Sequence, residues 1–149
     1  MHSGDTFKLA DYEETIRLVL ESGGEFRMYP KGTSMLPLIK QGRDSVVLIK
    51  PEKKLVPGDI IFYLRENGQY VLHRIVDVRD GGYVLCGDNQ TGLEYGIREE
   101  QIIGVVKSVF RGEKCISGKS AGYRLYLFVW RSFLIRRIYF KLRRMIHGR

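Results

Sequence analysis

Residues 57–87, PGDIIFYLRENGQYVLHRIVDVRDGGYVLCG, contain the pattern that decides the fold. Three apolar runs, rich in β-branched and aromatic residues, are separated by the turn signals Glu66-Asn67-Gly68 and Asp80-Gly81-Gly82. A further turn signal, Pro57-Gly58-Asp59, precedes the first run. The stretch therefore predicts three consecutive antiparallel strands, over residues 60–65, 69–78 and 83–86.

Three more short apolar runs flank this stretch and continue the same pattern. They cover residues 25–29, 45–49 and 102–110. Six strands at close spacing, with no long helix between them, are typical of a mainly β fold. We expect a coiled, barrel-like antiparallel body, and the 17 glycines agree with many tight turns.

Helices are predicted at both ends of the chain. Residues 6–21 have apolar side chains at helical spacing, and Gly23-Gly24 ends the pattern. Near the C-terminus, the apolar and basic residues between 134 and 146 fall on opposite helical faces. The predicted organisation is an N-terminal helix over 1–24, a β-rich body over 25–111, a linker over 112–122 and a basic amphipathic helix over 123–149.

The charge of the chain is concentrated in its last segment. Residues 121–149 contain eight of the 25 basic residues and none of the 17 acidic ones, so the first 120 residues are neutral overall. Such asymmetry indicates an anionic partner for the tail. An apolar face opposite arginines is typical of a helix that lies on an anionic membrane surface.

Other positions for the tail remain open at this stage. The helix could instead dock on the body or on a second subunit. Nucleic acid is not expected as a partner, because the apolar face exceeds what a phosphate-binding helix needs. The sequence has no signal peptide and no run of about 20 apolar residues that could span a bilayer. We therefore expect a peripheral membrane protein on the cytoplasmic face.

The segment Gly32-Thr33-Ser34-Met35-Leu36-Pro37 could present a serine hydroxyl at a chain bend. Gly32 permits unusual backbone angles, and Pro37 restricts the exit of the bend. Amide groups at such a bend could bind an oxyanion. Taken alone, the signal is weak, because a serine in a turn is usually an ordinary turn residue.

One histidine lies inside the β-rich region. His73 falls in the run Val71–Val76, whereas His2 and His147 lie at the two ends of the chain. A general base at neutral pH is most often a histidine, so His73 is the candidate base. A packed strand histidine without chemical function is the alternative.

A polar turn follows the third strand of the opening stretch. Gly87-Asp88-Asn89-Gln90 comes directly after it, and Glu94 follows four residues later. Turn chemistry alone accounts for a Gly-Asp-Asn sequence. The two carboxylates Asp88 and Glu94 are nevertheless candidates to support His73.

Taken in order, these motifs resemble those of the signal peptidase I superfamily of S24/S26 serine peptidases. The resemblance covers residues 25–107 and rests on Gly32–Pro37, Pro57–Ile61, His73–Val76, Gly87–Asn89 and Ile103–Val106. The common bacterial enzymes use a lysine as base. His73-Arg74 instead resembles the archaeal, endoplasmic-reticulum and spore-former branch, here in a small form without a membrane anchor ahead of the body.

The resemblance implies a signal-peptidase or repressor-protease fold and a serine endopeptidase activity. Ser34 would be the nucleophile and His73 the general base, with Asp88 or Glu94 as the supporting carboxylate. In that branch an aspartate six residues after the Gly-Asp-Asn aspartate takes this role, and here the position is Glu94.

The resemblance also implies a site around the nucleophile. Thr33 and Met35 would belong to the oxyanion and substrate pocket, and the Ser34 amide would contribute to the oxyanion hole. Arg74 is expected to pair with a carboxylate such as Asp88 rather than to act chemically.

The expected substrate is a precursor protein or peptide that loses a signal or leader segment. Two other functions remain open, a non-catalytic peptide-binding module on the same fold and a self-cleaving S24-type regulator. No cofactor is expected. Cys86 and Cys115 match no metal-binding spacing and are interpreted as ordinary thiols.

Overall fold

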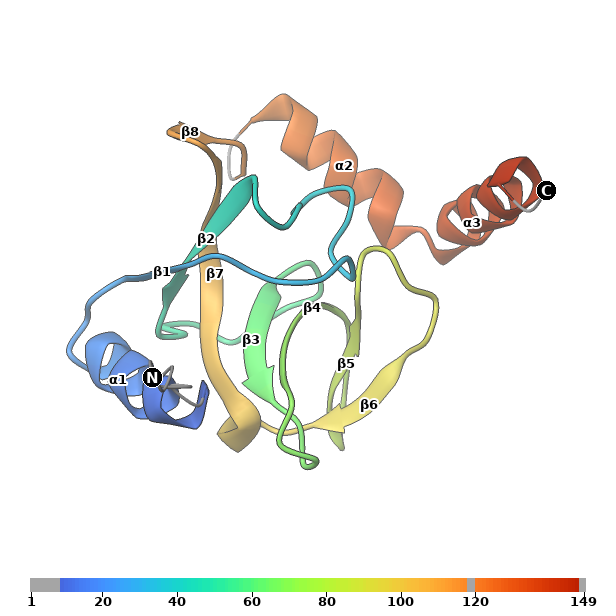
Figure 1. Ribbon diagram of the computed structural model, residues 1–149. Coiled ribbons are helices and arrows are strands. Elements are labelled where there is room, and N and C mark those ends of the chain that lie inside the picture. Colours follow the sequence, from blue (N-terminus) through green and yellow to red (C-terminus); the bar gives the residue numbers. More distant parts are fainter. Residues whose placement is uncertain (1–8, 118–119, 148–149) are drawn as a thin grey trace, which may run out of the picture.

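The computed structural model describes residues 9–117 and 120–147, which form one antiparallel sheet with helices at both ends (Figure 1). The predicted mainly β fold is confirmed. Residues 6–8 of the first predicted helix lie outside the described residues. In chain order the elements are α1 Leu9–Glu21, β1 Phe26–Met28, β2 Asp44–Ile49, β3 Ile60–Leu64, β4 Tyr70–Arg79, β5 Gly82–Cys86, β6 Glu94–Ile97, the 3-10 turn Glu99–Gln101, β7 Ile102–Arg111, β8 Lys114–Cys115, α2 Ala121–Arg131 and α3 Phe133–His147.

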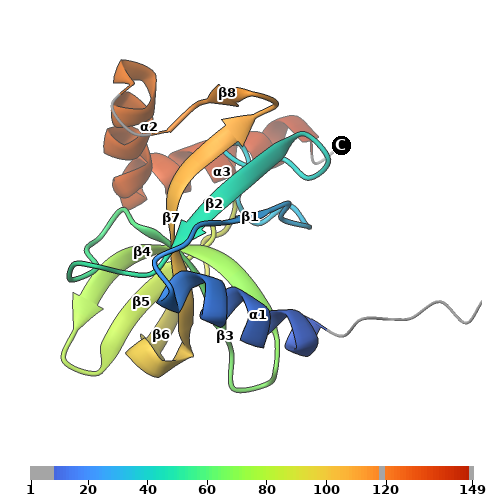
Figure 2. The same cartoon turned by 90° about the vertical axis from the view of Figure 1, so that its left-hand side faces the viewer.

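The strands follow the order β1-β2-β7-β3-β4-β5-β6, and β8 pairs with β7. All pairs are antiparallel, and the sheet is strongly coiled (Figures 1 and 2). The six strands expected from the sequence correspond to β1–β5 and β7. Strands β6 and β8 are additions that the apolar pattern did not predict.

Strand β3 occupies the centre of the sheet, and both of its faces are buried. Successive side chains of a strand point to opposite faces. Accordingly, Ile60 and Phe62 join one apolar cluster, and Ile61 and Tyr63 join the other. Burial on both faces explains why the sequence of β3 is a continuous apolar run rather than an alternating one.

The β3–β4 hairpin fixes the position of His73. Gly68 turns the chain with a φ of 84°, a value that favours glycine. The resulting register puts Ile61 opposite His73 and Tyr63 opposite Val71. Tyr63 is thus a diagonal neighbour of His73 on the same face, within reach of an aromatic side chain.

Two helices follow the sheet where the sequence predicted a single helix over 123–149. Ser132 separates them: its amide donates to the Val129 carbonyl at the end of α2, and its hydroxyl accepts from the Ile135 amide at the start of α3. The predicted linker over 112–122 also contains structure, because β8 and the start of α2 fall within it; its residues 118–119 lie outside the described part.

In space, α2 runs along one end of the sheet and α3 projects from the body (Figures 1 and 2). Both helices lie near the loop between β5 and β6. Within residues 9–117 and 120–147, no helix has the length and apolar character needed to cross a bilayer.

Candidate active site

Ser34 lies at the start of a tight turn, half-buried beside the sheet. The Leu36 amide donates to the Thr33 carbonyl at 3.2 Å, and the Ile39 amide donates to the Met35 carbonyl at 2.9 Å. The Met35 side chain packs in the core, with 3% of it exposed, and so anchors the turn. Gly32 enters the turn with a φ of 90°, which agrees with the unusual backbone angle expected of it.

A cavity of about 220 Å³ brings the candidate nucleophile and base together. Ser34 and His73 both line it, as do Met35 and Gln90. Thr33 is exposed and is not among the described residues that line this cavity. Its backbone carbonyl instead helps to hold the turn.

His73 is almost entirely buried, with 3% of the residue exposed. Its Nδ1 atom lies 3.4 Å from the Tyr63 hydroxyl and 3.6 Å from Oε1 of Glu94. Burial lowers the pKa of His73 to about 4, although the negative charge of Glu94 acts in the opposite direction. The imidazole is therefore neutral at neutral pH, the form in which a histidine can accept a proton.

Glu94 is the carboxylate that the structure brings closest to His73. The Tyr63 hydroxyl donates to Oε1 at 2.9 Å, Arg65 Nε donates to Oε2 at 2.9 Å, and Arg65 Nη2 also donates to Oε1. Burial raises the pKa of Glu94, but the bonds from Arg65 and Tyr63 outweigh this effect and hold the pKa below its usual range. Glu94 is thus a carboxylate anion beside the imidazole.

Asp88 occupies a different place. Its carboxylate is fully buried and accepts from Nε and Nη2 of Arg74 at 2.8 and 2.7 Å, as the sequence led us to expect of Arg74. The Tyr126 hydroxyl donates to the same carboxylate at 2.6 Å. Arg74 in turn donates to the Gly58 carbonyl at 2.7 Å. Asp88 is therefore held in a buried network, and its carboxylate makes no contact with His73 among the described hydrogen bonds and ion pairs.

The turn that carries Asp88 supports the backbone of the Ser34 turn. The Asn89 amide donates to the Ser34 carbonyl at 2.8 Å, and Asn89 Nδ2 donates to the Thr33 carbonyl at 3.1 Å. A Cβ atom on Gly87 would lie 2.7 Å from the Ser34 carbonyl oxygen, so only glycine fits there without displacement. The Gly-Asp-Asn sequence thus positions the serine turn.

Tyr63 and Arg65 are site residues that the sequence analysis did not identify. Both belong to the β3–β4 hairpin and lie two residues apart, so they share a face. The hairpin turn at Glu66-Asn67-Gly68 was predicted, and its register would have placed Tyr63 diagonally from His73. The predicted pairing of these two strands could therefore have identified Tyr63 as a neighbour of His73, which the motifs alone could not.

Metal ligands and reactive cysteines are the other groups that could carry chemistry in the described residues. No group of three His, Cys, Asp or Glu side chains within them could hold a metal ion. Cys86 is buried and Cys115 is exposed, and both are free thiols. Burial raises the pKa of the Cys86 thiol despite the neighbouring Arg136 guanidinium, so Cys86 is not a reactive thiolate.

Comparison with known proteins identifies the family of the chain. Residues 7–107 match the family described as Peptidase S24-like, which covers most of the chain and all the motifs discussed above. The comparison with curated proteins gave no match. With a coiled antiparallel sheet and the family match over about two thirds of its length, the chain belongs to the S24-like peptidase family.

Proposed function

We propose that this chain is a serine endopeptidase in which Ser34 is the nucleophile, His73 is the general base and Glu94 orients His73. The observation that carries the proposal is the shared cavity of Ser34 and His73. Glu94 lies at the Nδ1 side of the imidazole, so Nε2 is the nitrogen left for the serine. This order of nucleophile, base and carboxylate follows the logic of a catalytic triad.

The first half of the reaction transfers an acyl group to Ser34. His73 is neutral because burial lowers its pKa, and it accepts the hydroxyl proton as the Ser34 oxygen bonds to the peptide carbonyl carbon. The imidazolium that forms is stabilised by Glu94 and then gives the proton to the leaving amine. In the second half, a water molecule loses a proton to His73 as its oxygen bonds to the ester carbonyl carbon. The imidazolium then returns this proton to the Ser34 oxygen as the ester bond breaks, which releases the acid product and the free serine.

The Ser34 amide is the candidate donor to the oxyanion. It makes no hydrogen bond with any residue in the described part of the chain, whereas the Leu36 and Ile39 amides are both bonded within the turn. A preorganised amide donor stabilises the charge that develops on the carbonyl oxygen. Met35 lines the same cavity and contributes to the substrate pocket.

We propose a precursor protein or peptide with a signal or leader segment as the substrate. Support for this substrate comes from family resemblance and not from the geometry of the site. The test incubates the protein with synthetic precursor peptides and follows the products by mass spectrometry. Wild type is compared with Ser34→Ala, His73→Ala and the control Ser22→Ala, which changes an exposed serine at the end of α1.

We expect cleavage by wild type and by Ser22→Ala, and a loss of at least 100-fold in both site variants. A fluorophosphonate probe should label Ser34 of the wild-type protein. Absence of labelling and cleavage in a folded wild-type protein would identify a peptide-binding module instead. Fragmentation of the chain itself, seen in its intact mass and lost in Ser34→Ala, would identify a self-cleaving regulator.

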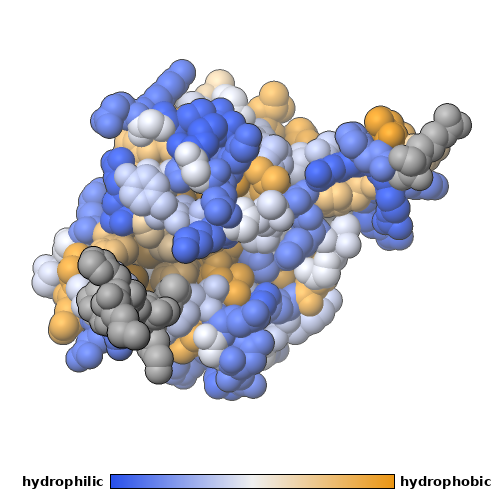
Figure 3. All heavy atoms as spheres, viewed as in Figure 1, coloured by the Kyte–Doolittle hydropathy of each residue, from blue (hydrophilic) through white to orange (hydrophobic). Residues whose placement is uncertain are grey.

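We further propose that α2 and α3 bind an anionic membrane surface. The side of α3 that meets the body carries Arg136 and Arg143, seven residues apart. The apolar side chains of the helix remain exposed, in part as orange spheres in Figure 3, although Leu134, Ile138 and Met145 also line an open groove with Gln90 and Leu93. The apolar side consists of Leu134, Ile135, Ile138, Tyr139, Leu142, Met145 and Ile146.

The basic residues beside this apolar side favour an anionic lipid surface as its binding partner. Arg137, Lys141 and Arg144 flank it, and a helix with this composition binds anionic lipid through both its apolar and its basic residues. We expect the protein to sediment with vesicles of phosphatidylserine and phosphatidylcholine, and not with phosphatidylcholine alone. Leu142→Glu should release it, whereas Leu18→Glu, the same change at an exposed leucine of α1, should not.

The alternatives give different results in the same experiment. Equal sedimentation of Leu142→Glu and wild type would contradict the membrane proposal. A doubled mass in solution that Leu142→Glu returns to that of one chain would indicate that a second copy covers α3. Added salt should weaken vesicle binding, because it screens the basic residues.

A further inference from the structure

We infer that α2 and α3 position the nucleophile: Tyr126, Trp130 and Arg136 hold the Gly87–Gln90 turn, and this turn holds Ser34. The three are positioning residues, since they act through the turn and not on the substrate. The kinetic part of this inference rests on the proposed role of Ser34, whereas the structural part can be tested without it.

The inner side of the Gly87–Gln90 turn contacts the Ser34 turn directly. Asn89 donates to the carbonyls of Ser34 and Thr33 at 2.8 and 3.1 Å. The missing side chain of Gly87 allows the two backbones to approach closely. Gln90 lines the cavity that holds Ser34 and His73. A shift of this turn would therefore move the serine and one wall of the cavity together.

From α2, two side chains hold Asp88 on the outer side of the same turn. The Tyr126 hydroxyl donates to the Asp88 carboxylate at 2.6 Å, and Trp130 Nε1 donates to the Asp88 carbonyl at 2.7 Å. The two rings stack on each other with centroids 5.1 Å apart. Burial raises the pKa of Tyr126, with the Asp88 charge acting in the same direction, so the phenol remains a donor.

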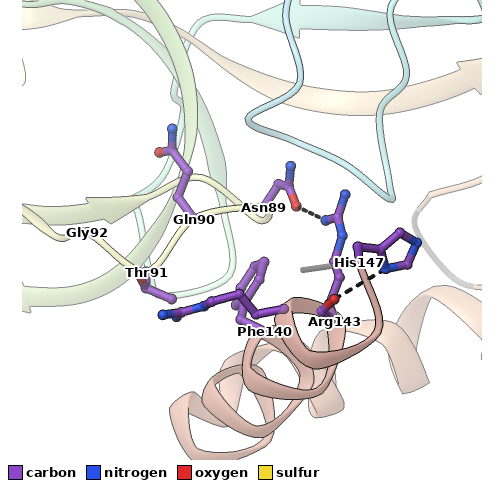
Figure 4. Close-up of a pocket in the computed structure, with 8 residues that line it drawn as sticks. Asn89, Gln90, Thr91, Gly92, Phe140, Arg143 and His147 are labelled. Carbon is purple, nitrogen blue, oxygen red and sulfur yellow. Dashed lines mark hydrogen bonds between the residues drawn. The ribbon is translucent and has the colours of Figure 1, made fainter. Parts of the chain in front are cut away.

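From α3, Arg136 reaches the carbonyls at both ends of the turn. Its Nη2 donates to the Gly87 carbonyl at 2.7 Å and to the Gln90 carbonyl, and it lies 3.3 Å from Cys86 Sγ. Only 1% of Arg136 is exposed, which is unusual for an arginine. Arg143 adds a bond from Nη1 to Asn89 Oδ1 at 2.8 Å (Figure 4).

Each residue of the Gly87–Gln90 turn is thus bonded to a helix on one side, while the turn meets the serine on the other. Turns lack the ladder of bonds that fixes a strand, and their backbone groups need partners elsewhere. Here α2 and α3 supply these partners. Because a misplacement of about 1 Å can cost 100-fold in rate, the helices contribute to catalysis without touching the substrate.

The test compares Arg136→Met, Arg136→Lys and Trp130→Phe with Arg131→Met, a control at an exposed arginine that ends α2. We expect Arg136→Met to lower kcat about 10-fold or more, with a smaller change in KM. Arg136→Lys should restore part of kcat, because one ammonium can still donate to the two carbonyls. Trp130→Phe keeps the ring packing and removes only the bond to Asp88, so kcat should fall less.

Hydrogen exchange at the Asn89 amide provides the structural readout. Exchange should accelerate in Arg136→Met and in Trp130→Phe, and remain at the wild-type rate in Arg131→Met. Wild-type exchange and wild-type kcat in folded Arg136→Met and Trp130→Phe would overturn the inference. If the wild-type protein proves to have no peptidase activity, but exchange at the Asn89 amide is still faster in Arg136→Met and Trp130→Phe, the positioning role stands and only the proposed function is refuted.

Discussion

Two arginine–carboxylate pairs flank the candidate site, and they differ in what surrounds them. The Arg74–Asp88 pair has side chains that are 2% and 0% exposed, and every oxygen of Asp88 is bonded. The Arg65–Glu94 pair has side chains that are 30% and 28% exposed, and Glu94 also faces His73. The first pair is suited to hold the structure, whereas the second keeps a carboxylate available to a group that changes its charge.

The largest expected effect is on the buried pair. Asp88→Asn should lower the free energy of unfolding by about 3–5 kcal/mol, because it leaves the Arg74 guanidinium buried without a counter-charge. Urea unfolding followed by circular dichroism measures this change. The control Asp77→Asn, in an exposed pair with Arg79, should leave stability nearly unchanged. Equal losses in both variants would remove the distinction between the pairs.

The second prediction concerns the half-exposed pair. Glu94→Gln should reduce kcat about 100-fold while the chain stays folded, because the amide cannot stabilise an imidazolium as an anion does. Peptide cleavage and probe labelling at Ser34 measure the change. Full activity of Glu94→Gln would show that a group other than Glu94 supports His73. The functional role assigned to the Arg65–Glu94 pair would then be wrong.

The third prediction uses pH to examine His73 itself. Its pKa of about 4 in the folded protein lies below the ordinary value of 6.5, so the unfolded chain takes up the proton first as pH falls. Stability from this group is complete above pH 6.5 and is lost as pH falls toward 4. Between pH 7 and pH 5 the loss should be about 2 kcal/mol.

Unfolding of wild type and His73→Gln at the two pH values isolates this contribution, which should be absent from the variant. Peptidase activity should persist to about pH 5 and fall below pH 4, where the base is protonated. A decline of activity near pH 6.5 would show that the imidazole is not desolvated as described.

The smallest effect is expected from Tyr63, whose hydroxyl contacts both His73 and Glu94. Tyr63→Phe removes the 2.9 Å bond to Glu94 and the 3.4 Å contact with His73, and it should cost about 1 kcal/mol of stability. Activity should fall less than in Glu94→Gln, since the carboxylate remains. A larger loss than that of Glu94→Gln would make Tyr63, and not Glu94, the principal partner of His73.

Much of the fold follows from local sequence patterns. The apolar runs and turn signals predicted β1–β5 and β7, and the expected pairing of Arg74 with a carboxylate such as Asp88 is confirmed. Strand β6 escaped because it is short, with Gly96 at a φ of 74°, and gains its order from pairing with β5. Glu94 belongs to β6, so its position beside His73 could not be read from the same pattern.

The C-terminal region differed from its prediction for a similar reason. Helical periodicity alone gave one helix over 123–149, but Ser132 ends α2 and caps α3 with its own backbone and hydroxyl groups. Periodicity also could not say which face of α3 meets the body. The partners of Arg136 are backbone carbonyls of a distant turn, and such contacts leave no mark in the spacing of apolar residues.

The inward orientation of Arg136 and Arg143 of α3 has a thermodynamic consequence. The helix is attached to the body through bonds from Arg136 and Arg143 to oxygen atoms, while its apolar residues stay in contact with water. Heat-capacity changes arise chiefly from apolar surface that becomes hydrated. Detachment of α3 should therefore proceed with a small heat-capacity change and little curvature with temperature, whereas the melting of the sheet should have the large value of an ordinary core.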